Sequence, residues 1–210
     1  MKKIWNCILF VLFVQGVSAQ TDTLLFKTNF GNFKVMLYDF TPNHRALILN
    51  AVNNNVYHKA LFNRVIDNFV VQGGAHDHAI AEREKNIDKT QRYRLKPEFN
   101  QLAFHKLGAL GAGRDDNEDK SSFLDQIYFV VGKQVTQTDL DLLEQNKKYT
   151  FTPQQKQTYL NRGGLPRLDG DYTVFGEVFE GLDVLLKISK LKTDAKDAPI
   201  NDVIFEIEKL

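Results

Sequence analysis

Alternating apolar and polar residues predict short β-strands along most of the chain. In the run from Asn32 to Asp39, Phe33, Val35 and Leu37 recur at every second position, as expected for a strand that buries one face. The preceding run from Thr23 to Thr28 is also rich in β-favouring residues, and a three-residue connection ending in glycine joins the two runs. The pattern therefore predicts a hairpin at the start of the folded region.

The same pattern continues to the C-terminus, with a second hairpin predicted about the turn Asp67-Asn68. The strands predicted after the first hairpin are Leu61 to Ile66, Phe69 to Gln72, Ala103 to Leu110, Ile127 to Val131, Tyr172 to Phe179 and Asp202 to Lys209. Many short strands with few helices favour a mainly β fold. We expect a closed antiparallel β-barrel capped by helices, because closure leaves no bare sheet edge.

Two helices are predicted to cap this barrel. Thr41 suits the N-cap and Pro42 the first position of a helix that follows the first hairpin. The apolar residues expected to face the core from this helix are Ala46, Leu47, Leu49 and Val52. A shorter helix is predicted from Leu182 to Lys190.

A change of character between residues 133 and 165 indicates an insertion. Two helices rich in Gln and Lys are predicted there, with Thr138 or Thr152 as caps. Because their apolar faces are thin, we expect them to lie on the single domain rather than to form a second one. The mixed-charge stretch from Glu82 to Lys96 is predicted to be a solvated loop.

The N-terminus has the pattern of a secretory signal peptide. Lys2 and Lys3 precede an apolar run from Ile8 to Val14, and small residues precede a cleavage site after Ala19. We therefore expect a signal peptide over residues 1–19 and a mature domain over 20–210. A retained membrane anchor is the alternative, but the run is shorter than the roughly 20 apolar residues that span a bilayer.

Export is the location that this leader predicts, to the periplasm or, as the alternative, into the medium. We expect no stable membrane insertion after cleavage. The only cysteine, Cys7, lies inside the leader, so the mature chain would have no thiol for a disulfide, for catalysis or for a metal.

Composition fits one globular domain, and the charge balance excludes one class of partner. The chain has 210 residues, of which 43% are hydrophobic. The chain has 27 basic and 26 acidic residues, and removal of Lys2 and Lys3 with the leader leaves 25 basic and 26 acidic residues. Such a chain has no strong field to attract nucleic acid. We expect a monomer that acts on polypeptides.

The segment FNRVIDNFVVQGG, residues 62–74, carries the candidate chemistry. Rotation about an X-Pro bond is slow because the amide is resonance-stabilised, with a barrier of about 18–20 kcal/mol. A catalyst of this rotation needs no nucleophile and no cofactor. It needs an apolar slot for the proline ring and a fixed donor that favours the twisted amide, for which an arginine guanidinium is well suited.

Arg64 and Gln72 are predicted to come close across the second hairpin, where Gln72 could hold the guanidinium in place. Phe69 and Val70 add apolar surface beside them. The alternative interpretation is that Arg64 is simply an exposed residue of an amphipathic strand. An isolated arginine in such a run more commonly has that role.

Taken as a whole, the segment resembles the cyclophilin signature, with its Phe-x-Arg-Val-Ile, Phe and Gln-Gly-Gly elements at the same spacing. The resemblance continues in order through Gly31 to Asp39, Phe104 to Leu110, Gln126 to Val130 and Leu168 to Leu185. It implies a peptidyl-prolyl cis/trans isomerase that assists the folding of proline-containing polypeptides. It also implies catalytic roles for Arg64, Phe69 and Gln72, and substrate-binding roles for Phe62, Val70, Gly113, Arg114, Gln126, Tyr128, Leu168 and Tyr172.

Several positions depart from the family pattern. Asn63 replaces a histidine, Ile127 replaces an aromatic residue, Gly113-Arg114 replace the usual Ala-Asn, and Arg167 stands where cyclosporin-sensitive members carry tryptophan. These departures leave a second hypothesis open, in which the protein is a catalytically weak binding module or chaperone that uses the same groove.

Other motifs point to no further chemistry. His76-Asp77-His78 has no third ligand close in the sequence, so no metal site is predicted. The acidic run 115–119 begins like a calcium loop, but Lys120 holds the place of the required glycine, which favours a solvated turn. The chain contains neither the dinucleotide-binding glycine pattern nor a Gly-x-Ser-x-Gly elbow.

Overall fold

The computed structural model describes residues 22–147 and 149–210. The predicted signal peptide, its cleavage site and the alternative membrane anchor lie outside these residues. Among the helices in the described ranges, none is both long and apolar enough to cross a bilayer.

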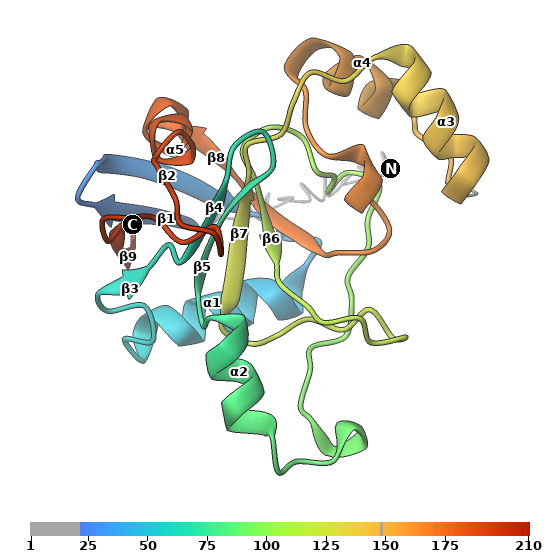
Figure 1. The fold of residues 1–210 in the computed structure, drawn as a ribbon. Helices are drawn as coiled ribbons and strands as arrows, with labels where there is room; N and C mark the ends of the chain where they lie inside the picture. Colours follow the sequence, from blue (N-terminus) through green and yellow to red (C-terminus); the bar gives the residue numbers. More distant parts are fainter. Residues whose placement is uncertain (1–21, 148) are drawn as a thin grey trace, which may run out of the picture.

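Nine antiparallel strands form one curled sheet, which Figure 1 shows at the centre of the molecule. The strands follow the order β3-β9-β1-β2-β8-β6-β7-β5-β4. Their bounds are β1 Thr23–Thr28, β2 Gly31–Leu37, β3 Ala60–Leu61, β4 Arg64–Ile66, β5 Val70–Gly74, β6 Ala109–Ala112, β7 Gln126–Val130, β8 Val174–Glu180 and β9 Ile204–Lys209. Both predicted hairpins are confirmed, and Asn68 turns the second one with a φ of 57°.

The expected closure of the barrel needs a correction. No ladder joins the two end strands, β3 and β4, in the described part of the chain. These strands are successive pieces of one segment, which pairs first with β9 and then, after Phe62 and Asn63, with β5. The sheet is therefore a curled sheet whose ends meet through the covalent chain rather than through hydrogen bonds.

One predicted strand begins later than expected. The run Ala103 to Leu110 becomes strand only at Ala109, because Gly108 has a φ of 84° and the Ala109 N–H donates to the Lys106 carbonyl in a turn. Phe104 instead packs in the insertion. The alternation of apolar residues in the run does not distinguish a strand from this extended loop.

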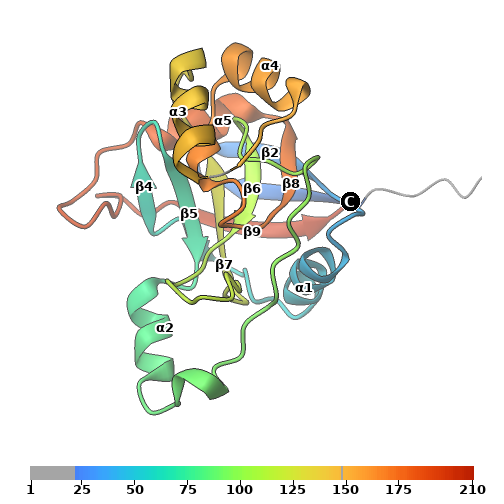
Figure 2. The same cartoon turned by 90° about the vertical axis from the view of Figure 1, so that its right-hand side faces the viewer.

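The interior of the curled sheet is filled by aromatic and aliphatic side chains. The rings of Phe26 and Phe33 stack at 4.9 Å, and Phe129 meets both edge-on. Helix α1 (Pro42–Asn53) adds Ile48 to this core, and helix α5 (Leu182–Ser189) adds Leu185. Figures 1 and 2 place these helices towards opposite ends of the sheet, where they cap the interior.

Three further helices and two short 3-10 turns lie in the described loops. They are α2 Asp77–Glu84, α3 Gln137–Lys147, α4 Pro153–Arg162, η1 Lys89–Gln91 and η2 Pro166–Leu168. Part of the stretch predicted as a solvated loop is therefore helical. Glu84 at the end of α2 is buried, because both of its carboxylate oxygens accept hydrogen bonds from Arg94 at 2.7 Å.

The insertion forms two helices, α3 and α4, as predicted, and they pack on the domain through a small apolar cluster. Leu140 of α3 and Tyr159 of α4 meet Phe104 there. Thr152 caps α4 in a reciprocal bond with Gln155, as predicted. The cap of α3 is Thr136 rather than Thr138. The Asp139 N–H donates to the Thr136 hydroxyl, and the Thr136 N–H donates to the Asp139 carboxylate.

The start of α1 is stabilised differently from the prediction. Thr41 precedes the helix, but its hydroxyl donates to the Tyr38 carbonyl at 3.2 Å and makes no cap bond. The free N–H groups of Asn43 and His44 instead donate to Glu98, at 3.0 and 2.9 Å. The His44 ring also contacts Glu98 at 2.6 Å, and His44 rather than Ala46 faces inward, with Ile48 and Ala51.

We predict that Glu98→Gln lowers the free energy of unfolding by about 1–2 kcal/mol, because one cap acceptor of α1 becomes a donor. Burial lowers the pKa of His44, against the opposing effect of Glu98. Protonation of His44 therefore favours the unfolded chain, and stability should fall as the pH drops below about 6.5. Urea unfolding followed by circular dichroism between pH 4 and 7 measures both effects.

Thr41→Val is the matched control, since it removes the other candidate cap. A loss of stability for Thr41→Val that equals or exceeds the loss for Glu98→Gln would contradict the assignment of Glu98 as the cap.

Candidate functional site

A pocket of about 160 Å³ opens on the outer face of the sheet, beside β4, β5 and β7. We call it the outer pocket. Its lining residues are Arg64, Phe69, Val70, Gln72, Asp77, Gly113, Arg114, Gln126, Tyr128, Arg167, Leu168 and Tyr172. The structure thus brings together every site residue expected from the sequence except Phe62, and it adds Asp77 and Arg167.

Strand register explains why distant residues meet in this pocket. Arg64 on β4 lies opposite Gln72 on β5, Gln72 lies opposite Tyr128 on β7, and Tyr128 lies opposite Gly111 on β6. Side chains that are directly opposite in adjacent strands share one face. The outer face therefore presents a row of two polar groups and one tyrosine, while Val65, next along β4, faces the core.

Two glycines make room for the large side chains of this row. A Cβ atom on Gly111 would lie 2.2 Å from the Tyr128 ring, and one on Gly113 would lie 2.0 Å from the Gln126 side-chain oxygen. At either position a Cβ would force the facing side chain to move. Gly113, one of the departures from the family pattern, therefore permits the observed position of the Gln126 side chain.

Apolar groups form the wall of the outer pocket, and two arginines cover its rings. Val70 and Leu168 are buried in a cluster that Phe69 and Tyr172 join from the pocket side. The Arg167 guanidinium lies over the Phe69 ring at 4.6 Å, and the Arg114 guanidinium lies over Tyr172 at 4.9 Å.

Arg64 has a different partner from the one predicted. Its Nε atom lies 3.6 Å from a carboxylate oxygen of Asp197, and Asp197 also accepts a hydrogen bond from the Val65 N–H through its carbonyl. Gln72 lies opposite in register but does not hydrogen-bond the guanidinium, so it does not hold Arg64 in place. The side chain of Arg64 is about one third exposed and lines the outer pocket.

The expectation that Phe62 contributes to the site is wrong. Its side chain is 1% exposed and stacks on Phe205 at 4.3 Å inside the curled sheet. The alternation is interrupted at Phe62 and Asn63, where the segment changes its partner from β9 to β5, so Phe62 and Arg64 point to opposite faces. Asn63 fixes this change, because its side-chain amide donates to the Gly74 carbonyl at 2.7 Å.

Asp77 is the acidic residue of the site that sequence reasoning missed. It is the first residue of α2 and accepts a hydrogen bond from the Gln126 amide at 2.6 Å, while the same amide donates to the Ala75 carbonyl at 3.0 Å. In the sequence, Asp77 stands out only as the centre of His76-Asp77-His78, a pattern that suggests metal binding rather than contact with Gln126. No group of three or more metal-binding side chains gathers within the described ranges.

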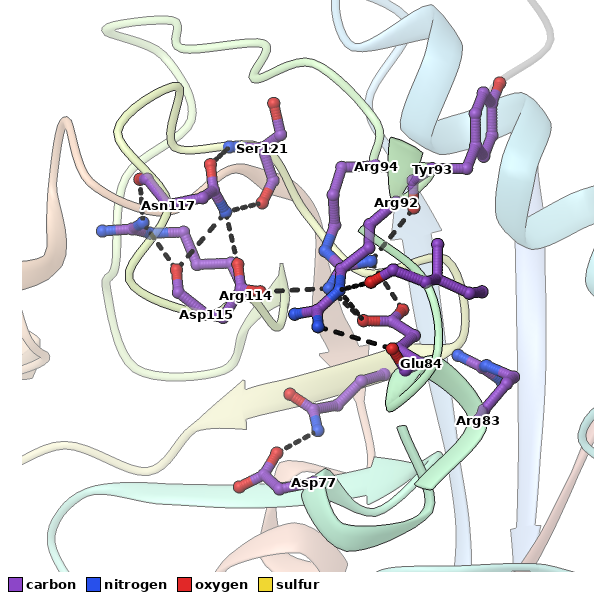
Figure 3. A network of polar contacts seen from close by, with 12 residues as sticks. Asp77, Arg83, Glu84, Arg92, Tyr93, Arg94, Arg114, Asp115, Asn117 and Ser121 are labelled. Atoms are coloured by element: carbon purple, nitrogen blue, oxygen red, sulfur yellow. Dashed lines mark hydrogen bonds and ion pairs between the residues drawn. The ribbon is translucent and has the colours of Figure 1, made fainter. Parts of the chain in front are cut away.

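A network of charged groups supports this end of the pocket, as Figure 3 shows. Arg94 bridges Glu84 and Asp115, and the Arg94 hydrogen bonds lower the pKa of Glu84. Arg114 donates to the carbonyls of Asp115 and Asn117 at 2.8 and 3.0 Å. The acidic run is the solvated turn that the sequence predicts, since Asp116, Glu118 and Asp119 are exposed. Bonds to Asp115 and Asn117 fix the Arg114 stem beside Tyr172.

Comparison with known proteins decides the family. The family model described as "Cyclophilin type peptidyl-prolyl cis-trans isomerase/CLD" matches residues 23–209. The chain belongs to the cyclophilin-type peptidyl-prolyl cis-trans isomerases. The resemblance inferred from FNRVIDNFVVQGG is thereby confirmed.

Individual cyclophilin relatives cover most of the chain. Proteins of Staphylococcus epidermidis and Staphylococcus saprophyticus, each named "putative peptidyl-prolyl cis-trans isomerase", are 30% identical over 85% and 90% of this chain and over 86% and 92% of their own lengths. A crystal structure of a Cryptosporidium parvum cyclophilin has a TM-score of 0.64 at 18% identity and covers 90% of this chain and 98% of its own. Another, determined in the presence of the dipeptide Ala-Pro, has a TM-score of 0.61 at 19% identity and covers 88% and 96%.

Behind the outer pocket, this cyclophilin has a buried chain of hydrogen bonds that reaches the insertion. The Tyr128 hydroxyl lies 2.8 Å from one ring nitrogen of His105, and the other ring nitrogen lies 2.6 Å from Asp169. The second oxygen of Asp169 accepts from the Tyr159 hydroxyl of α4 at 2.5 Å. Lys147 of α3 donates to the Asp169 carbonyl at 2.9 Å. Both inserted helices therefore contact the turn that carries the pocket residue Leu168.

We predict that Tyr159→Phe lowers the free energy of unfolding by about 1–3 kcal/mol, because one oxygen of the buried Asp169 loses its partner. Burial raises the pKa of Tyr159 and Tyr128 well above 10.0, with the nearby Asp169 adding to the effect. Only the unfolded chain releases these protons near pH 10, so stability should fall as the pH rises above about 10. Urea unfolding between pH 7 and 11 measures both changes.

Tyr93→Phe is the matched control, because Tyr93 is 73% exposed. It should leave stability and its pH dependence unchanged, whereas Tyr159→Phe should flatten the alkaline loss. Equal alkaline slopes for Tyr159→Phe and the wild type would contradict this account of the network.

Proposed function

We propose that this cyclophilin accelerates cis/trans isomerisation of X-Pro bonds in exported polypeptides and so assists their folding. The observation that carries the proposal is the position of Arg64 at a pocket of about 160 Å³ that has an apolar wall. Phe69, Val70 and Leu168 form the apolar wall of the pocket, which suits a proline ring.

Isomerisation requires the amide nitrogen to lose its conjugation with the carbonyl. A donor aimed at that nitrogen favours the twisted state over either planar isomer, and a preorganised donor in a partly desolvated site is more effective than water. The guanidinium of Arg64 remains charged at any physiological pH. Its pairing with Asp197 through Nε leaves the terminal nitrogens for the substrate.

Gln72 and the side-chain oxygen of Gln126 supply hydrogen-bonding groups around this centre, whereas the Gly113 N–H and carbonyl are already paired with the main chain of Gln126 and Phe123. In the proposed complex the two glutamine side chains hold the peptide groups that flank the proline, so that binding energy fixes the chain while the X-Pro bond turns. No step involves a covalent intermediate or a change in protonation, since only a rotation takes place.

We predict that Arg64→Ala lowers kcat/KM for an X-Pro peptide by about 100-fold, the scale seen when one preorganised donor is removed. Arg64→Lys should have an intermediate value, because a single ammonium replaces a rigid fork. Exchange NMR spectroscopy on a peptide with a single X-Pro bond measures the rate of the catalysed cis/trans interconversion. Without a catalyst the interconversion takes tens to hundreds of seconds.

Arg162→Ala is the matched control, since Arg162 is an exposed arginine at the end of α4 and outside the outer pocket. Its rate should stay within about twofold of the wild type. Unaltered isomerisation by Arg64→Ala would remove the basis of the proposed function.

The departures at Asn63 and Arg114 motivate a second candidate function, a binding module or chaperone with little catalysis. Asn63 ties the strands together at Gly74, and Arg114 is held by the acidic turn, so both have structural partners. The same NMR experiment separates the two functions: peptide binding without accelerated exchange in the wild type would favour the binding module.

Export is the part of the proposal that rests on the N-terminal sequence. We predict that the mature chain recovered from the periplasm or the medium begins at Gln20, as measured by intact mass. Ala19→Arg should block cleavage, because the signal peptidase site requires a small residue there. Ser18→Arg, at the unrestricted middle position, is the matched control. Recovery of the uncut chain from the cytoplasm would contradict export.

A further inference from the structure

We propose that a second pocket, between helix α3 and the segment Gly164 to Arg167, binds an apolar side chain of the same polypeptide whose proline fills the outer pocket. We call it the flanking pocket. This inference rests on the proposed function, because it defines a further part of the substrate for the same site.

The flanking pocket has a volume of about 290 Å³, larger than the outer pocket. Its apolar lining residues are Val135, Leu142, Leu143, Leu165 and Pro166. Leu142 forms part of the opening and is 51% exposed. Polar residues, Lys133, Asp139 and Arg167, complete the lining. An apolar centre with a few charged groups around it is the usual composition of a site that binds an apolar side chain of a polypeptide.

Arg167 lines both pockets, which are therefore adjacent. Its guanidinium lies over the Phe69 ring of the outer pocket. Pro166 and Leu168, its two neighbours in the 3-10 turn η2, line the flanking pocket and the outer pocket respectively. An extended chain advances about 3.3 Å per residue, so residues a few positions from a proline in the outer pocket extend well beyond that pocket, towards its neighbours.

The walls of the flanking pocket are already fixed without a ligand. Lys147 of α3 donates to the Arg167 carbonyl at 2.7 Å and so joins the helix to the opposite wall. The N–H groups of Gly164 and Leu165 donate to the carbonyls of Lys133 and His105, at 3.0 and 2.8 Å. Preformed walls reduce the entropy lost on binding. Figures 1 and 2 show that both walls belong to the same end of the molecule.

The location favours a segment of the substrate over an unrelated ligand. The pocket opens next to the outer pocket rather than on a remote face, and one side chain separates the two. A polypeptide that places its proline in the outer pocket brings its own neighbouring residues to this site at high effective concentration. The insertion would then contribute to substrate selection.

Fluorescence titration with labelled X-Pro peptides tests the inference. The peptides carry either leucine or serine in turn at each nearby position on both sides of the proline. At one position, leucine should lower the wild-type Kd about tenfold relative to serine, the expected gain from burying one leucine side chain. Leu142→Asp should reduce this ratio to about one, because the pocket opening becomes charged.

Gln145→Asp adds the same charge to an exposed position of α3 outside the flanking pocket, and it should keep the tenfold ratio. Peptides that bind without any leucine preference, or a preference that survives Leu142→Asp, would overturn the inference while leaving the proposed function intact. Peptides that bind with the preference but are not isomerised would support the flanking pocket and contradict the proposed enzymatic function.

Discussion

The buried carboxyl group of Asp169 is the constraint on which the site depends. Asp169 is 3% exposed, and a buried carboxyl group is strongly unfavourable unless its oxygens are hydrogen-bonded. The main-chain and ring N–H groups of His105 satisfy one oxygen, and Tyr159 satisfies the other. Each partner comes from a different part of the chain. The loop before β6, helix α4 and the turn that carries Leu168 must therefore fold together.

This shared constraint explains why the insertion is part of the domain. The apolar cluster of α3 and α4 is small, as the sequence indicates, and would give two short helices little independent stability. Tyr159 and Lys147 compensate by bonding to the turn at residues 166–171. Tyr128 connects the same network to the floor of the outer pocket. Hydrogen bonds thus join the insertion to the pocket without a gap, from Tyr159 through Asp169 and His105 to Tyr128.

Features that depend on neighbouring residues were predictable, and features that depend on distant partners were not. The hairpins and the register of Arg64 with Gln72 follow from strand alternation and turn residues within one short segment. The burial of Phe62 depends on a change of strand partner, which alternation cannot show. Glu98 caps α1 from 54 positions away, and Asp197 pairs with Arg64 across most of the chain. No local pattern identifies either contact.

Two of the residues that differ from the family pattern, Arg114 and Arg167, lie beside the apolar wall of the outer pocket. Arg114 and Arg167 introduce two cations, yet each lays a flat guanidinium against an aromatic ring. Such stacking covers the ring while the guanidinium edges stay available for hydrogen bonds. Main-chain carbonyls take up these bonds for Arg114, which fixes its orientation. The two substitutions therefore add positive charge beside the pocket, while the rings of Phe69 and Tyr172 remain part of its wall.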